Sequence, residues 1–192
     1  MAFTVPLPRA PFDGGTLQWY ENELGWAAAD SVPVQLLTGL RFDVLELPVD
    51  AGAAVLSRMD LDSPVALMGL RMRLLVAAGS ADELPGLLDW LEWGGIALDL
   101  TAIGAGGRMT APPPPGWPGS RGAAAWLRPP VPGREVEPTL PALAPFGHSA
   151  GSGGGNSPDL VRLVDAAATE CHRARLLRTN TPHANTQPLA FS

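Results

Sequence analysis

Residues 41–48, Arg-Phe-Asp-Val-Leu-Glu-Leu-Pro, decide the fold that we expect for this chain. They follow a turn signal at Thr38-Gly39, and their centre is aliphatic and β-branched. An apolar run of this length bounded by turn residues is typical of an interior strand. The stretch also sets acids near the strand end, where a nucleotide-handling enzyme would hold a metal ion.

Helices and strands are both expected on either side of this strand. Apolar spacing predicts helices near residues 16–25, 50–59 and 80–93, the last opening with a capping box at 80–83. Further strands are predicted at 31–38, 64–68, 71–77, 96–101, 108–111 and 123–127, with a tight hairpin turn at 104–107. The elements mix without strict βαβ repetition, so we expect an α+β domain, a mixed β-sheet packed with helices.

The composition divides the chain into five parts. We expect a flexible arm (1–15), a folded domain (16–132), a Pro/Gly-rich linker (133–156), a C-terminal amphipathic helix (157–178) and a tail (179–192). The helix start is signalled by Ser157-Pro158-Asp159, which supplies a cap, a first-turn proline and a first-turn acid.

The C-terminal helix is a candidate for binding a protein partner or a second copy of the chain. Its glycine-rich tether favours a contact outside its own domain, although docking on that domain stays open. The residues expected to make the contact are Leu160, Leu163, Val164, Ala167, Cys171 and Arg175.

Charge and residue usage exclude several classes of function. The 192 residues carry a formal net charge of -6, which disfavours a protein that grips phosphate backbones. All 13 basic residues are arginine, which excludes lysine-based chemistry, and the single cysteine excludes an internal disulfide. No signal peptide and no apolar run of about 18 residues is present, so we expect a cytoplasmic protein without a membrane span.

Three stretches, in this order, resemble the bifunctional primase/polymerase domain, which is of the archaeo-eukaryotic primase type and is found in actinobacterial genomes and mobile elements. They are 38–48, 69–76, and Leu98-Asp-Leu100 followed by Gly106-Gly-Arg-Met-Thr-Ala-Pro-Pro113. The likeness covers roughly residues 16–132, and its most specific piece is the third. The resemblance implies the fold of a domain that takes part in DNA replication.

The resemblance also implies where a metal would bind. In that family a hydrophobic strand ends in two acids one residue apart, which hold divalent metal for nucleotidyl transfer. The matching positions are Glu46 and Pro48, and proline cannot ligate a metal. The family's third acid matches Asp99, whereas Met72 stands where the family has a phosphate-contacting histidine. We therefore expect a catalytically degenerate domain, needing no cofactor, that acts as a binding or regulatory module through protein–protein contacts.

Two other functions stay open. An active nucleotidyltransferase or primase would use Glu46 and Asp99 with Mg²⁺ or Mn²⁺, and Asp50 would approach from the following loop. An accessory nucleic-acid-binding protein is the second, although the net charge speaks against it.

The arginines near these acids have two interpretations. Through their fork geometry, they could cradle a nucleotide phosphate. They could instead form ion pairs with Glu46 and Asp99, as arginines beside strand-end acids often do. The candidates are Arg71, Arg73 and Arg108.

Overall fold

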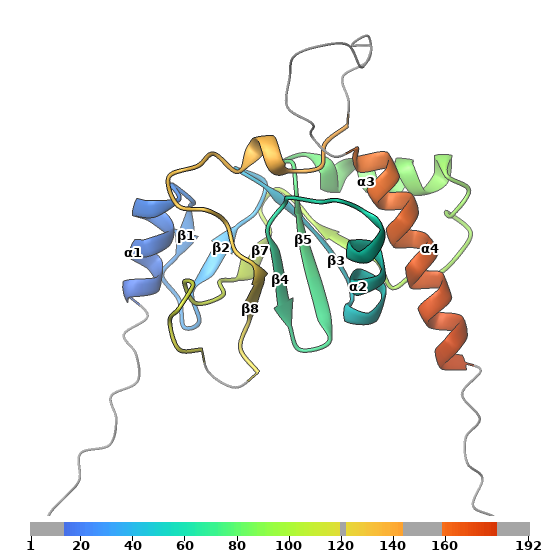
Figure 1. Ribbon diagram of the computed structural model, residues 1–192. Coiled ribbons are helices and arrows are strands. Elements are labelled where there is room, and N and C mark those ends of the chain that lie inside the picture. The colour runs from blue at the N-terminus through green and yellow to red at the C-terminus, as the bar shows by residue number, and fades with distance from the viewer. Residues whose placement is uncertain (1–13, 120–121, 144–158, 180–192) are drawn as a thin grey trace, which may run out of the picture.

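The computed structural model describes residues 14–119, 122–143 and 159–179. In these residues two antiparallel sheets lie beside each other, and helices cover one face of the larger sheet (Figure 1). The α+β class expected from the sequence is confirmed, with two antiparallel sheets in place of one mixed sheet. None of the helices in these ranges is long and apolar enough to cross a membrane.

The larger sheet has the strand order β6-β3-β5-β4-β8. Its strands are β3 (Asp43–Pro48), β4 (Val65–Met68), β5 (Arg71–Val76), β6 (Thr101–Ile103) and β8 (Ala125–Arg128). The helices α2 (Val49–Arg58) and α3 (Ser80–Trp90) follow β3 and β5. The succession β3-α2-β4-β5-α3-β6 with this order is the split βαβ, or ferredoxin-like, arrangement. The interior strand expected at 41–48 is confirmed, since β3 pairs with both β5 and β6.

The smaller sheet joins β1 (Ala28–Ala29), β2 (Gln35–Leu37) and β7 (Arg108–Thr110), beside helix α1 (Gly14–Glu23). The hairpin predicted around 104–107 is wrong, because β6 pairs with β3 and β7 pairs with β2. The turn instead carries the chain from one sheet to the other. It is held by the Thr38 hydroxyl, which donates to the Gly104 carbonyl at 2.5 Å.

The apolar residues form two clusters, one on each face of the larger sheet. Alternate residues of β5 point to opposite faces, so Met72 and Leu74 belong to the cluster beneath the helices, whereas Leu75 belongs to the other. The second cluster lies between the sheets and is rich in aromatic side chains, including Tyr20, Trp26 and Phe42. The Tyr20 hydroxyl donates to the Pro112 carbonyl at 2.7 Å.

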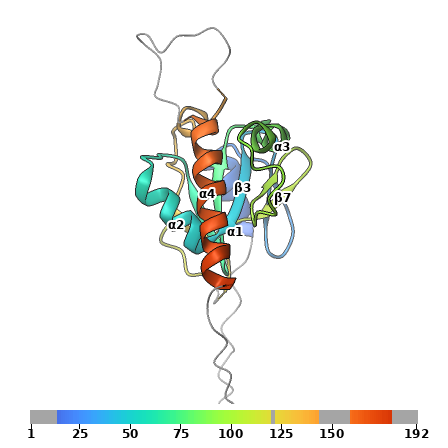
Figure 2. The same ribbon diagram turned by 90° about the vertical axis from the view of Figure 1, so that its right-hand side faces the viewer.

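Helix α4 (Leu160–Thr179) packs between α2 and α3 as part of the same domain (Figure 2). The prediction that this apolar face binds a partner is therefore wrong, because the face is buried in the protein's own core. At most 1% of the surface of each of its apolar members is exposed: Leu160, Leu163, Val164, Ala167 and Cys171. Arg175 is exposed, and it donates to the Ala97 carbonyl at 2.5 Å.

The first part of the predicted linker is packed against the domain. Val136 and Leu140 flank the short 3-10 helix η1 (Glu137–Thr139) and belong to the cluster between the sheets. Ala142 forms a parallel bridge with Asp159, and the Leu160 amide donates to the Ala142 carbonyl at 3.1 Å. The rest of the linker, with the arm up to residue 13 and the tail from residue 180, lies outside the described residues.

The N-terminal end of α3 departs from the predicted capping box. Ser80 is the first helical residue, not the cap, and Gly79 stands at the N-cap with no side-chain hydrogen bond. Instead the buried Asp43 of β3 accepts a hydrogen bond from the Ala81 amide at 2.9 Å. At the other end the Trp93 amide donates to the Leu88 carbonyl at 2.8 Å, as in a Schellman motif, and Glu92 has a φ of 64°.

Candidate functional site

The register of the larger sheet brings three of the predicted site residues, Glu46, Arg71 and Arg73, to one face. Glu46 lies opposite Arg73 on one side and Thr101 on the other, and Pro48 lies opposite Arg71. Residues directly opposite in antiparallel strands project from the same face. This is the face turned away from α2, α3 and α4, because Leu45 and Leu47 point toward those helices.

Arg71 bridges the two acids that the family resemblance assigns to metal binding. Its Nε lies 3.1 Å from Glu46 Oε1, and its Nη1 lies 2.6 Å from Asp99 Oδ1. Its Nη2 also donates to the Glu46 carbonyl at 3.2 Å. The second carboxylate oxygen of Glu46, Oε2, lies 2.7 Å from Arg73 Nε. A guanidinium therefore stands between the carboxylates of Glu46 and Asp99.

The C-terminal helix completes this network. Arg178, near the end of α4, has Nη2 at 3.4 Å from Asp50 Oδ1 and Nη1 at 3.8 Å from Asp99 Oδ2. Together with the pairs above, three acids face three arginines, so the cluster is formally neutral. Sequence reasoning missed Arg178, because no local pattern near the end of the helix indicates a contact with acids far away in the sequence.

Burial divides the network into a stronger and a weaker half. The side chains of Glu46 and Arg73 are 18% and 13% exposed, whereas that of Asp99 is 50% exposed. Burial lowers the pKa of Arg71, but hydrogen bonds and charges from Asp99 and then Glu46 outweigh it and raise the pKa above its usual value. Solvent screens the outer pairs, so Glu46 and Arg73 form the part that stabilises the fold.

The residues present do not fit a divalent metal. The carboxylates of Glu46 and Asp99 are both engaged by arginine, and Asp50 is paired with Arg178. Within the described ranges, no group of three or more histidine, cysteine, aspartate or glutamate side chains is placed to hold a metal ion. A cation at this place would first have to displace Arg71.

Arg108 does not join this network, so the structure does not bring the three candidate phosphate-binding arginines together; that they bind phosphate stays a prediction. Arg108 lies on β7 in the smaller sheet and is exposed. Arg71 and Arg73 do lie together, but each is paired with Glu46. Their positive charge is therefore already compensated by carboxylates.

The difference between the two halves of the network can be tested by substitution. Glu46→Gln removes the charge that faces the mostly buried Arg73, and we expect it to lower the free energy of unfolding by about 2 kcal/mol. Asp99→Asn acts at a half-exposed, screened position and is expected to cost less than about 0.5 kcal/mol. Urea unfolding of both variants measures the difference, and equal costs would contradict this ranking.

Cys171 lies beneath this network and is predicted to be unreactive in the folded protein. Its thiol lies 3.7 Å from the Asp99 carbonyl and is buried. Burial, reinforced by the negative charge of Asp99, raises the pKa of the Cys171 thiol to about 12. Because a thiol reacts as its thiolate, labelling by a disulfide reagent at pH 8 should be slow and should accelerate as urea unfolds the chain. Rapid labelling without urea would contradict the buried position.

The raised pKa of the Cys171 thiol also predicts that the folded protein loses stability at alkaline pH. The folded state holds the Cys171 proton more tightly than the unfolded state does. The resulting stability is complete below the unfolded pKa near 9 and is lost as the pH rises toward 12. Cys171→Ala should therefore lose less stability than the unsubstituted protein between pH 8 and pH 11, as measured by urea unfolding.

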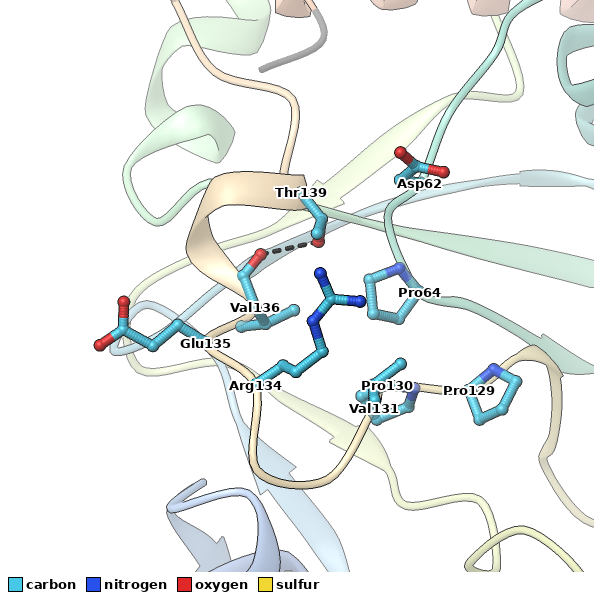
Figure 3. Close-up of a pocket in the computed structure, with 9 residues that line it drawn as sticks. All are labelled: Asp62, Pro64, Pro129, Pro130, Val131, Arg134, Glu135, Val136 and Thr139. Atoms are coloured by element: carbon cyan, nitrogen blue, oxygen red, sulfur yellow. Dashed lines mark hydrogen bonds between the residues drawn. The ribbon is translucent and has the colours of Figure 1, made fainter. Parts of the chain in front are cut away.

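A small cavity of about 50 Å³ lies elsewhere, beside η1 (Figure 3). Pro64, Pro129 and Pro130 contribute to its walls, and Arg134 points into it between Val136 and Pro64 (Figure 3). None of the predicted site residues lines it. The candidate site is therefore the ion-pair network on the sheet, and not this cavity.

Compared with known proteins, the chain matches no family model, no curated protein and no solved structure.

Proposed function

We propose that this chain is a primase/polymerase-like α+β domain that lacks competent metal chemistry and serves as a cytoplasmic binding or regulatory module through protein–protein contacts. The observation that carries the proposal is the position of Arg71, whose guanidinium spans Glu46 and Asp99. Pro48, which lies opposite Arg71, stands where a second strand acid would be needed.

The energetics favour a non-catalytic role. Two-metal transfer relies on ions that neutralise charge at the attacking and leaving oxygens. Here the positive charge is supplied by a side chain that is fixed by two carboxylates and one carbonyl. A guanidinium donates hydrogen bonds but cannot coordinate a phosphate oxygen or activate a water as a metal ion does. It therefore stabilises the acids without supplying this chemistry.

Primer synthesis and primer extension test the proposal directly. Full-length protein with Mg²⁺ or Mn²⁺, a template and nucleotides is expected to give no product above a blank. Calorimetric titration of Mn²⁺ with nucleotide is expected to give no measurable heat of binding. Robust product that disappears in Glu46→Ala would overturn the proposal.

An active nucleotidyltransferase is the second candidate, favoured by one observation. Glu46 and Asp99, two of the acids that the resemblance assigns to metal binding, both contact the same guanidinium of Arg71. This function would require Arg71 to leave both acids when a metal–nucleotide complex arrives. Tight, metal-dependent nucleotide binding in the same titration would favour it over the regulatory module.

A further inference from the structure

The outer face of α3 carries features that its own fold does not use. Helical spacing places Leu84, Leu87 and Leu88 toward the core. The opposite side, here named the α3 outer face, is exposed, and α3 itself lies near the edge of the molecule (Figure 2). It consists of Asp82, Glu83, Gly86, Asp89 and Trp90, followed by Glu92 in the C-terminal cap.

Three of these residues are unfavourable for the stability or solvation of the isolated domain. Gly86 weakens a helix interior, and an added Cβ would meet nothing within 4 Å, so no contact in the described structure requires a glycine. Glu92 adopts a φ of 64°, which glycine would adopt without strain. Trp90 is 71% exposed. Departures from local preference without a compensating contact are typical of functional positions.

The charges on this face are also unusual. Asp82 and Glu83 complement the dipole at the start of α3, but Asp89 and Glu92 lie at its end, where acids are unfavourable and where no basic residue stands in the last turn. None of these acids has an ion pair or side-chain hydrogen bond among the described residues. In contrast, the acids paired with arginine elsewhere include Glu46, Asp99, Glu137 and Glu170.

We propose that the α3 outer face is the docking surface for a basic amphipathic helix of a partner protein. The exposed indole of Trp90 supplies an aromatic anchor of the kind that dominates interfaces, and it also attracts arginine. Gly86 lets the partner helix approach the α3 backbone closely. The acids around them pair with arginine or lysine and set its orientation. Nucleic acid does not fit, because the face is negative.

This inference deepens the proposed function, since it names the contact surface of a binding module. The two fail separately, because primer extension reports on Glu46 and Asp99, whereas peptide binding reports on α3. If the protein showed polymerase activity, the proposed regulatory role would be contradicted, but the proposed docking surface would not. If substitutions on the α3 outer face did not change peptide binding, the proposed docking surface would be contradicted, but the proposed lack of catalysis would not.

A labelled peptide provides the probe. It has about 18 residues, or five helical turns, with leucine at positions spaced three and four apart and arginine on the remaining face. Fluorescence anisotropy with the full-length protein is expected to show saturable binding that weakens with salt. Trp90→Ala is expected to weaken binding at least about tenfold, as for an interface anchor.

Two variants separate docking from a structural role. Gly86→Ala and Glu92→Gly should each raise the Tm by about 3 °C, because they relieve local costs of the fold. Both are nevertheless expected to weaken peptide binding several-fold. A residue that serves only the fold would change the Tm and leave the affinity unchanged.

A charge-matched pair controls for nonspecific attraction to an acidic protein. Glu83→Gln/Glu92→Gln removes two charges from the α3 outer face, and Glu21→Gln/Glu23→Gln removes two from exposed positions on α1. Only the first pair should reduce affinity beyond about twofold. Equal losses in both pairs, or unchanged affinity in Trp90→Ala, would overturn the proposal. So would a concentration-dependent dimer abolished by Trp90→Ala, because the occupant would then be a second copy.

Discussion

A chain that ends after Leu143 is expected to lose its cooperative unfolding transition. Helix α4 supplies a large part of the core cluster beneath the helices, so its removal would expose Leu45, Leu47 and Val55 to water. Domains of this size are stable by only about 5–15 kcal/mol. The loss of a helix that contributes this much core exceeds what such a margin can absorb. Circular dichroism during urea titration should show a broad, non-sigmoidal change.

A matched pair of point variants tests the same claim within the full chain. Leu163→Ala removes a fully buried side chain and is expected to cost about 2–5 kcal/mol. The neighbouring Arg162→Ala changes an exposed residue of the same helix and should cost less than about 0.5 kcal/mol. If the truncated chain kept the midpoint of the full chain, α4 would be a separate appendage after all.

Replacement of Asp43 by alanine is expected to lower the free energy of unfolding by about 3 kcal/mol, since it removes a helix cap and leaves the part-buried Ala81 amide without this acceptor. Asp43 is 1% exposed, and its carboxylate accepts a hydrogen bond from the Ala81 amide at the start of α3. No side chain at Gly79 can take over this role. The effect should therefore concentrate on α3, and hydrogen exchange of its first amides should accelerate most.

Asp43→Asn is the control for this substitution. It keeps an oxygen that can accept from Ala81 while removing the charge that favours the helix N-terminus. We expect it to retain more than half of the stability lost in Asp43→Ala. If both variants were as stable as the unsubstituted protein, the cap would not contribute to the anchoring of α3.

The strand at 43–48 could be predicted because its information is local. An apolar run between turn signals has one simple interpretation, an interior strand. The same locality explains why the helices α2 and α3 and the hairpin β4–β5 lie close to their expected positions.

Tertiary partners could not be read in the same way. The apolar stripe of α4 looks the same whether it packs on its own domain or on a partner, and the glycine-rich stretch before it favoured the wrong choice. The cap of α3 comes from Asp43, 38 residues away, and no short motif announces it. Arg178 reaches Asp50 over 128 residues for the same reason. Among the site residues, pairing between the arginines and acids was foreseen as one of two interpretations, but the central place of Arg71 was not.

The bridge between Ala142 and Asp159 has a consequence for how this protein can vary and be engineered. Because Ala142 bridges Asp159 and its carbonyl accepts from the Leu160 amide, the start of α4 is held directly against the segment that ends at residue 143. Length changes at this junction should be nearly neutral, since loop entropy grows only slowly with length. A fluorescent protein grafted there should leave the domain intact, and sister sequences should differ in length at this point more than anywhere within β3 to β6.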